Sequence, residues 1–284
     1  MARELKKNHL EMYKSKGKYR KLFEVIQEDS ELSFEIRKND VAMVYYRKKK
    51  ILTIERGKKI NLLDKKYVGD LEEYQKLYQS YNFNNSDNLK SKDCIKKYFK
   101  KAKKYAYKHD YGIEFEFQQN ILRGNSSYSN RYMVVDMEWA FSQANIDKDE
   151  RICKTRIDLL VVDTELNSNG YNDIYMAELK VGNNAQDGKS GIRDHIKKND
   201  ELINHPLACE ALRNDVINIV EQKRELGILD GTPKELKFVD GQKPKTMLVL
   251  AYRNNDEYLR FVDEVRAYED ELKVIYYDMN IKLF

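Results

Sequence analysis

The chain has 284 residues and a formal net charge of +5, a length that suits one large domain or a core with a smaller appendage. Residues 1–21 alternate Lys and Arg with polar residues, and no run approaches the roughly 18 apolar residues that span a bilayer. We therefore expect a cytoplasmic protein with no membrane partner. Cys94, Cys153 and Cys209 show no Cys-x-x-Cys spacing and are expected to be reduced thiols.

The charge is unevenly distributed along the chain. Residues 1–108 hold 29 Lys and Arg against 15 Asp and Glu, a net +14, whereas residues 109–284 hold 23 against 32, a net −9. A basic front half beside an acidic back half indicates a polyanion-binding surface joined to a part that uses carboxylates. A general enrichment in Lys is the alternative explanation.

The N-terminal part predicts a small α+β module. An amphipathic helix is expected over 17–28. Three short β-type runs, the pattern of an antiparallel meander, follow at 32–37, 41–47 and 51–56. Asp70 is suited to cap a further helix that ends near Tyr81.

A polar stretch at 82–88 marks the predicted domain boundary, because it is rich in turn formers and has little apolar surface to bury. We therefore expect a basic module at 1–85, which contributes to nucleic-acid binding, and a main domain at 86–284.

The main domain predicts a mixed β-sheet flanked by helices. Helices are expected at 93–108, 113–122, 191–229 and 256–268. Strands are expected at 131–141, 156–163, 174–181, 246–252 and 272–278. An order in which three strands follow a helix and later strands alternate with helices indicates an α/β fold.

The helix at 93–108 has an apolar stripe on one side and lysines on the rest of its surface. Such a helix can pack on a core and bind a nucleic-acid backbone at the same time. The lysines expected to contact the backbone are Lys96, Lys97, Lys100, Lys101 and Lys104.

The strongest chemical signal is a pair of acidic residues in two successive apolar strands. Asp158 lies in Arg156-Ile-Asp-Leu-Leu-Val-Val162, and Glu178 begins Glu178-Leu-Lys180. If these strands form a hairpin, Asp158 and Glu178 lie side by side with Lys180 on the same face. Two adjacent buried carboxylates need a cation, which predicts a divalent metal site. An ordinary Glu–Lys ion pair on an exposed sheet is the alternative.

The tripeptide Glu-Leu-Lys carries no information by itself. It also occurs at Glu4-Leu5-Lys6, Glu235-Leu236-Lys237 and Glu271-Leu272-Lys273. None of these copies follows an apolar strand that holds an aspartate at hairpin distance.

Asp158, followed twenty positions later by Glu178-Leu179-Lys180, resembles the motif of the PD-(D/E)xK phosphodiesterase superfamily, which includes restriction and repair nucleases. Ile157 stands where the family name has proline. The resemblance implies a restriction endonuclease-like core of αβββαβ order and a metal-dependent nuclease that hydrolyses phosphodiester bonds, with DNA expected ahead of RNA. Restriction, phage defence, mobile-element processing and repair are the settings that it implies.

The resemblance also implies roles for the motif residues. Asp158, Glu178 and the Leu179 backbone carbonyl would hold Mg²⁺ or Mn²⁺. Lys180 would orient or help to deprotonate the attacking water and would offset charge on the phosphate.

Other residues are expected near the metal or the substrate. An upstream helical glutamate often joins the metal in this superfamily, and Glu114 and Glu116 are the candidates here. The remaining candidates for contacts to the substrate or to the metal ligands are Gln118, Lys189, His195, Arg156, Asp136 and Glu138. Asp136 and Glu138 either lie beside Arg156 or the metal, or face solvent at an edge of the sheet.

Alternatives stay open at this point. A nucleic-acid-binding protein with the same fold but without catalysis would share the basic surface and the sheet. Gly188-Lys189-Ser190 is similar to a phosphate-binding loop of an NTPase, but Asn183 stands where that motif requires its first glycine. A homodimer is compatible with the sequence.

Overall fold

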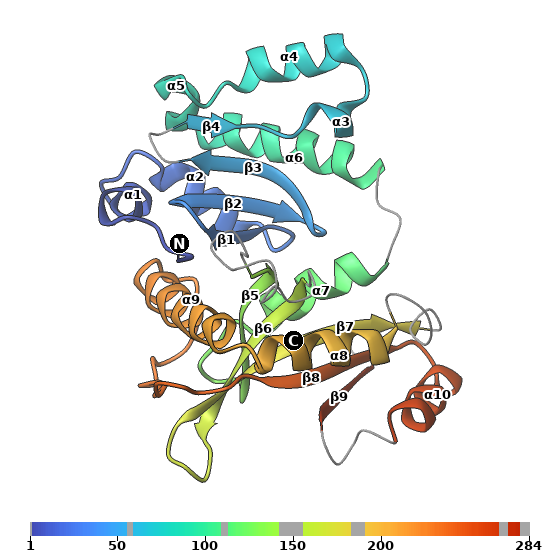
Figure 1. Cartoon of the computed structure of the whole chain (residues 1–284). Coiled ribbons are helices and arrows are strands. Elements are labelled where there is room, and N and C mark those ends of the chain that lie inside the picture. Colours follow the sequence, from blue (N-terminus) through green and yellow to red (C-terminus); the bar gives the residue numbers. More distant parts are fainter. Residues whose placement is uncertain are drawn as a thin grey trace. The chain divides into compact units, whose positions relative to one another are not determined.

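The computed structural model describes residues 2–55, 59–108, 113–141, 156–182, 191–266 and 272–278 (Figure 1). The chain divides into two compact units. The first unit comprises Met1–Arg123 and Asn218–Ile228, and the second comprises Gly124–Ile217 and Leu229–Phe284. Each unit is built on its own β-sheet with helices against it, so the chain is α/β as predicted.

The sheet of the first unit is the antiparallel meander that the sequence predicts. Its strands are β1 (Ser33–Arg37), β2 (Val41–Tyr46), β3 (Lys49–Glu55) and β4 (Lys59–Asn61), paired in that order. The sequence did not predict β4, because its three residues are too few to show an alternating pattern.

Helices α2 and α6 supply much of the core of this unit. The helices in the first part of the chain are α1 (Lys7–Leu10), α2 (Arg20–Glu28), α3 (Lys65–Val68), α4 (Leu71–Tyr81), α5 (Ser86–Lys90), α6 (Lys92–Lys108) and α7 (Ile113–Gly124), with a 3₁₀ turn at Glu11–Tyr13. Phe23 of α2 and Phe99 of α6 are buried in one cluster with strand residues such as Ile54. Asp70 caps α4 as predicted, because its carboxylate accepts from the Glu73 backbone N–H at 2.7 Å.

The polar stretch 82–88 is more firmly packed than its composition suggests. Phe83 is fully buried, and its ring meets Tyr98 of α6 edge-on with the ring centroids 5.1 Å apart. Helix α6 thus shares a core with the N-terminal sheet, and the first compact unit continues past residue 85. The functional division into 1–85 and 86–284 stays a prediction.

The second unit holds a five-stranded mixed sheet. Its strands are β5 (Tyr132–Trp139), β6 (Ile157–Leu166), β7 (Asn172–Val181), β8 (Lys245–Tyr252) and β9 (Lys273–Asp278), paired in that order. The pairs β5–β6 and β6–β7 are antiparallel, whereas β7–β8 and β8–β9 are parallel. Strand β7 is buried at all ten positions, although Asn172, Asp173, Glu178 and Lys180 lie among its apolar residues.

Helices connect the parallel strands, because parallel neighbours require a crossover. They are α8 (Ile192–Ile203) and α9 (Pro206–Glu225) between β7 and β8, and α10 (Asn255–Val265) between β8 and β9. Ile192 of α8 and Phe261 of α10 pack with Leu248 and Leu250 of β8. The predicted mixed sheet flanked by helices is therefore present.

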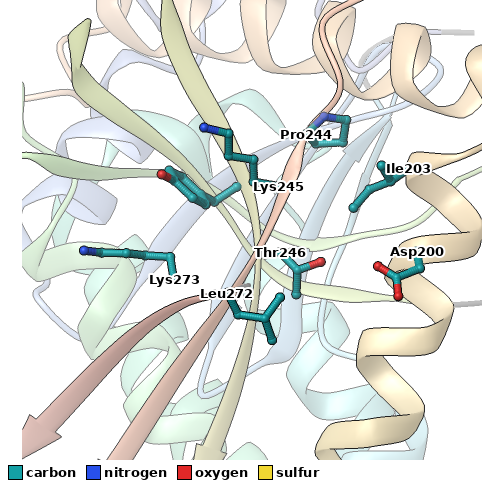
Figure 2. A pocket seen from close by; sticks show the side chains of 8 residues that line it. Asp200, Ile203, Pro244, Lys245, Thr246, Leu272 and Lys273 are labelled. Atoms are coloured by element: carbon teal, nitrogen blue, oxygen red, sulfur yellow. The ribbon is translucent and has the colours of Figure 1, made fainter. Parts of the chain in front are cut away.

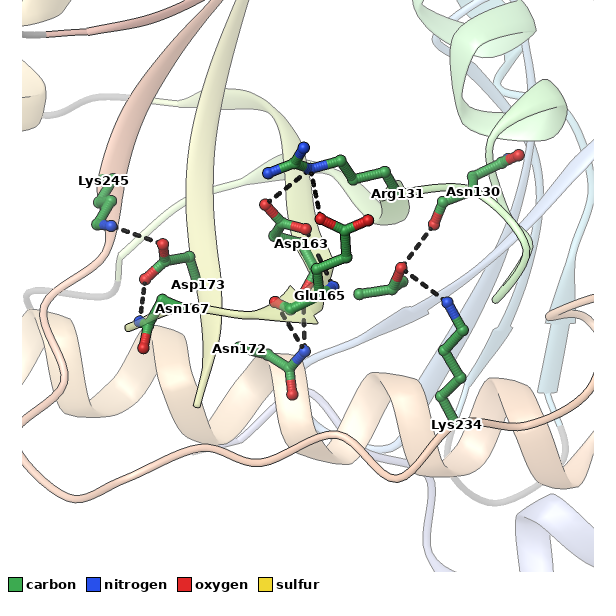
Figure 3. Close-up of polar contacts among 10 residues, drawn as sticks. Asn130, Arg131, Asp163, Glu165, Asn167, Asn172, Asp173, Lys234 and Lys245 are labelled. Atoms are coloured by element: carbon green, nitrogen blue, oxygen red, sulfur yellow. Dashed lines mark hydrogen bonds and ion pairs between the residues drawn. The ribbon is translucent and has the colours of Figure 1, made fainter. Parts of the chain in front are cut away.

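Polar contacts at the closed end of the β6–β7 hairpin fix its register (Figure 3). The Asn172 side-chain amide donates to the Asp163 carbonyl oxygen at 2.9 Å. Asn167 Nδ2 donates to Asp173 Oδ1 at 2.8 Å across the turn. A register shift between Val162 and Leu166 then separates the closed end from the pairs further along the hairpin. A slip of one residue would move every side chain of a strand to the opposite face.

Two further sequence predictions concern membranes and thiols. Within the ranges that the structure describes, no helix is long and apolar enough to cross a bilayer. Cys94 and Cys209 are free thiols, whereas Cys153 lies outside the described residues.

A buried ion pair joins the end of α9 to β1. Lys223 Nζ donates to Glu35 Oε2 at 2.8 Å, and the two side chains are 2 % and 1 % exposed. Removal of one partner leaves the other charge buried without its counter-charge.

We predict that Glu35→Gln lowers the free energy of unfolding by about 3–5 kcal/mol, measured by urea denaturation. The matched control is Glu225→Gln, which removes the partner of Lys14 in a more exposed pair at the end of the same helix. The control is expected to lose much less stability, and equal losses in the two variants would contradict the prediction.

Candidate functional site

Asp158 and Glu178 lie at the same level of two neighbouring strands. Leu159 pairs with Ala177 in the β6–β7 register, so the adjacent positions 158 and 178 face each other. Side chains of directly opposed residues project from the same face of a sheet. Asp158 is 7 % exposed and Glu178 is 4 % exposed, which places two carboxylates together in the interior.

Lys180 supplies a positive charge beside this pair. It follows Glu178 by two positions on β7, and its Nζ donates to Glu178 Oε1 at 2.6 Å. Lys180 is only 7 % exposed. The alternative of an ordinary ion pair on an exposed sheet is therefore wrong, because the pair is buried within one strand.

His195 reaches the same carboxylate from α8. Its Nδ1 lies 3.0 Å from Glu178 Oε2, so each oxygen of Glu178 has one nitrogen partner. Burial alone would raise the pKa of Glu178, but the close contact with His195 and the positive charge of Lys180 outweigh burial and hold this pKa below its usual value of 4.5. Glu178 is therefore ionised near neutral pH.

The backbone of Leu179 is turned toward Asp158. Leu179 N–H donates to Asp158 Oδ2 at 3.1 Å. In an extended strand the N–H and C=O of one residue point to the same neighbouring strand. The Leu179 carbonyl oxygen therefore faces the β6 side, where it can act together with the Asp158 carboxylate.

Glu138 adds a third carboxylate at this level of the sheet. Met137 pairs with Leu159 and Trp139 pairs with Ile157, so position 138 lies opposite Asp158. Glu138 has a left-handed φ of 57°, and its carboxylate pairs with Arg156 at 2.9 Å. This alignment could not be predicted from the sequence, because it depends on a register shift in β5.

Asp136, two residues before Glu138, is fully buried in β5 opposite Leu160. An edge position that faces solvent, one of the two alternatives for this residue, is therefore wrong. Its carboxylate belongs to the interior of the second unit.

The upstream glutamates lie in the first unit. Glu116 pairs with Arg47 at 2.9 Å, and Gln118 is buried in the same helix, α7. Glu114 is half-buried. Asp158 and Glu178 belong to the second unit. Their role at a metal stays a prediction. The ion pair between Arg47 and Glu116 was not predicted from the sequence.

The loop after β7 falls outside the described residues. Lys189 and the NTPase-like run Gly188-Lys189-Ser190 lie in 183–190, so the structure describes neither. Helix α8 begins with Gly191 as its N-cap residue.

The lysines of α6 form two groups. One group pairs with acids of the α2 region: Lys92 with Glu24 and Glu28, Lys96 with Glu28, and Lys103 with Asp29 and Glu31. Lys97, Lys100, Lys101 and Lys104 have no ion-pair partner within the described ranges. Of the predicted backbone contacts, Lys96 is thus the one that already has an acidic partner.

A separate cavity of about 390 Å³ lies where β8 and β9 begin (Figure 2). Lys245 and Lys273 line it, and Thr246 and Asp200 project toward each other within it. The Thr246 hydroxyl is buried and has no hydrogen-bond partner among the residues that the structure describes. Asp158, Glu178 and Lys180 are not among its lining residues.

Comparisons with known proteins identify no relative. No protein-family model matches the chain, and neither the curated proteins nor the solved structures contain a significant match.

The lowered pKa of Glu178 predicts how this site responds to acid. The group has a pKa of 4.5 when unperturbed and a lower pKa when folded, so its contribution to stability is present above about pH 4.5 and is lost as the pH falls through the folded value. We predict that the difference in unfolding free energy between the wild type and Glu178→Gln shrinks below about pH 4.5. Urea denaturation of both proteins over a pH series measures this difference, and a constant difference would contradict the assigned interactions.

Proposed function

We propose that this chain is a metal-dependent nuclease that hydrolyses phosphodiester bonds, with DNA as the expected substrate. The observation that carries the proposal is the alignment of Asp158 and Glu178, two buried carboxylates on one face, with Lys180 beside them. The order α7, β5, β6, β7, α8, β8 supports the proposal, because it agrees with the αβββαβ order of the restriction endonuclease-like core.

Mg²⁺ or Mn²⁺ fits the chemistry of the donor atoms in this site. Asp158 and Glu178 offer carboxylate oxygens and Leu179 offers a carbonyl oxygen, which are ligands that hard divalent cations prefer. A cation bound there would polarise a phosphate oxygen and make a bound water more acidic. Within the described ranges no group of three His, Cys, Asp or Glu side chains could hold a metal, so the carbonyl oxygen and water are proposed to complete the ligand set.

Lys180 and His195 have separate proposed roles. Lys180 now neutralises Glu178, and once that carboxylate has another counter-charge the ammonium group can hold the attacking water or donate to a phosphate oxygen. His195 keeps Glu178 in place through the 3.0 Å contact to its second oxygen. The ionised state of Glu178 makes it a ligand rather than a proton donor.

The exposed lysines of α6 are the proposed contact to the nucleic-acid backbone. Lys97, Lys101, Lys104 and Lys108 follow one another at spacings of four, three and four residues, which places them on one face of the helix. They extend over about 16 Å of the helix axis. A row of ammonium groups on this scale can neutralise several phosphates of one strand.

A nucleic-acid-binding protein without catalysis is the second candidate. It is favoured by one observation: both oxygens of Glu178 have nitrogen partners, Lys180 and His195. Titration of the chain with Mn²⁺ separates the candidates, because a nuclease must bind the ion through Glu178 and a non-catalytic relative need not.

We predict that Glu178→Ala and Lys180→Ala each abolish Mg²⁺- or Mn²⁺-dependent cleavage of DNA while the far-ultraviolet circular dichroism is retained. The matched controls are Glu235→Ala and Lys237→Ala, which change the same tripeptide in an exposed segment. Full activity is expected in both controls. Full activity in either site variant would rule out the assigned catalytic roles.

We predict that the two groups of α6 lysines affect DNA binding differently. Replacement of Lys97, Lys101 and Lys104 by Gln should reduce the slope of log Kd against log salt concentration by about 2–3. Replacement of Lys92, Lys96 and Lys103 by Gln removes the same charge but from side chains that pair with acids, and the slope should change by less than about 1.

Fluorescence anisotropy with a labelled duplex, measured without divalent metal over a salt series, gives both slopes. Equal changes in the two variants would show that net charge alone, and not the exposed row, governs binding.

A further inference from the structure

The β2–β3 turn has an unusual composition for its geometry. Tyr46 pairs with Lys49, which leaves Arg47 and Lys48 as a two-residue turn. Their φ angles are 46° and 63°, so both residues are left-handed. This conformation suits a type I′ turn, in which Asn-Gly is strongly preferred because other side chains are strained there.

The preceding turn of the same sheet shows the usual solution. Between β1 and β2, the left-handed positions are Asn39 and Asp40, with φ angles of 65° and 61°. Asn and Asp tolerate this conformation better than residues with long side chains do. The two adjacent long cations of the β2–β3 turn therefore adopt a backbone conformation that is unfavourable for their residue types. Such strain is typical of functional positions.

Aromatic rings and one carboxylate hold these two cations in place, because Arg47 also pairs with Glu116 at 2.9 Å. The Arg47 guanidinium lies 5.0 Å from the ring centroid of Tyr107, and Lys48 Nζ lies 4.9 Å from that of Phe115. The Arg47 backbone N–H donates to the Gln119 side chain, and Lys49 Nζ donates to the Ala106 carbonyl oxygen at 3.2 Å. The turn is thus anchored to α7 and to the last turn of α6.

Tyr107 leaves much of its ring to solvent. It is 58 % exposed although Arg47 contacts it. Tyr107 is followed by Lys108, the last lysine of the row on α6. An exposed aromatic ring next to a row of cations is the arrangement that stacks an unpaired base while the adjacent backbone is neutralised. Bases within a duplex are already stacked on each other, so a blunt duplex cannot use this ring.

Resting on the proposed nuclease function, we propose that Arg47, Lys48 and Tyr107 form a binding site for an unpaired stretch of the nucleic-acid substrate. The α6 lysines contact the backbone, and Tyr107 stacks a base that has left the duplex or lies in a single-stranded tail. The substrate class is therefore a strand with unpaired bases rather than a fully paired duplex.

The first experiment compares labelled DNAs by fluorescence anisotropy, without divalent metal. The wild-type chain should bind a duplex with a single-stranded tail more tightly than a blunt duplex of the same sequence. Tyr107→Leu should weaken binding to the tailed DNA by about tenfold, whereas Tyr107→Phe keeps the ring and should bind as the wild type does. Equal affinity for tailed and blunt DNA, or no effect of Tyr107→Leu, would overturn the proposal.

The second experiment tests why the two cations are present. The double variant Arg47→Asn, Lys48→Gly has the preferred type I′ sequence, so its Tm should rise by about 2–4 °C while its affinity for tailed DNA falls. A lower Tm would overturn the proposal, because it would show that these cations serve to anchor the turn. Unchanged affinity with a higher Tm would also overturn it.

These outcomes are distinguishable from failure of the proposed function. If the wild-type chain binds no nucleic acid, the proposed function and this site fail together. If it binds nucleic acid and cleaves it but shows no dependence on tails or on Tyr107, this site alone fails. Binding of heparin or anionic vesicles with the same dependence on Tyr107 would identify another polyanion as the partner and would overturn the nucleic-acid assignment.

Discussion

The candidate site depends on the register of the β6–β7 hairpin. The pairing of Leu166 with Asn172 at the closed end and the register shift between Val162 and Leu166 together place position 158 opposite position 178. A shift by one residue would place Asp158 and Glu178 on opposite faces of the sheet. The two carboxylates lie together because the hairpin holds this irregular alignment.

The second constraint is electrostatic. Two carboxylates that are less than a tenth exposed require compensating charge, since the interior solvates ions poorly. Lys180 and His195 supply nitrogen partners to Glu178, and the Leu179 N–H donates to Asp158. These contacts compensate the buried charge of both carboxylates.

Local patterns in the sequence predicted much of the fold. Apolar runs located β6 and β7, and helical periodicity located α2, α6 and α10 within a few residues. The shortest elements, β4 and α3, were missed because three or four residues do not establish a period. The packing of the stretch 82–88 could not be predicted, because its composition does not reveal that Phe83 packs against Tyr98.

Part of the candidate site could also be predicted from the sequence. The alternation of strand residues predicted that Glu178 and Lys180 share a face, whereas the pairing of position 158 with position 178 depends on the register shift between Val162 and Leu166. The alignment of Glu138 depends on an irregular register, and the contact of His195 with Glu178 depends on how α8 packs against the sheet. Neither follows from spacing. The Arg47–Glu116 pair likewise joins a turn to a helix far away in the sequence, and no local sequence pattern predicts it.

The proposed nuclease function requires that Asp158 and Glu178 share a divalent cation. A crystal structure of the full chain with Mn²⁺, located by its anomalous signal, tests this most directly. One ion is expected within about 2.3 Å of a carboxylate oxygen of each residue and of the Leu179 carbonyl oxygen. Lys180 is then expected to be no longer bonded to Glu178. Mn²⁺ bound elsewhere, or no ion between these carboxylates at saturating concentration, would contradict it.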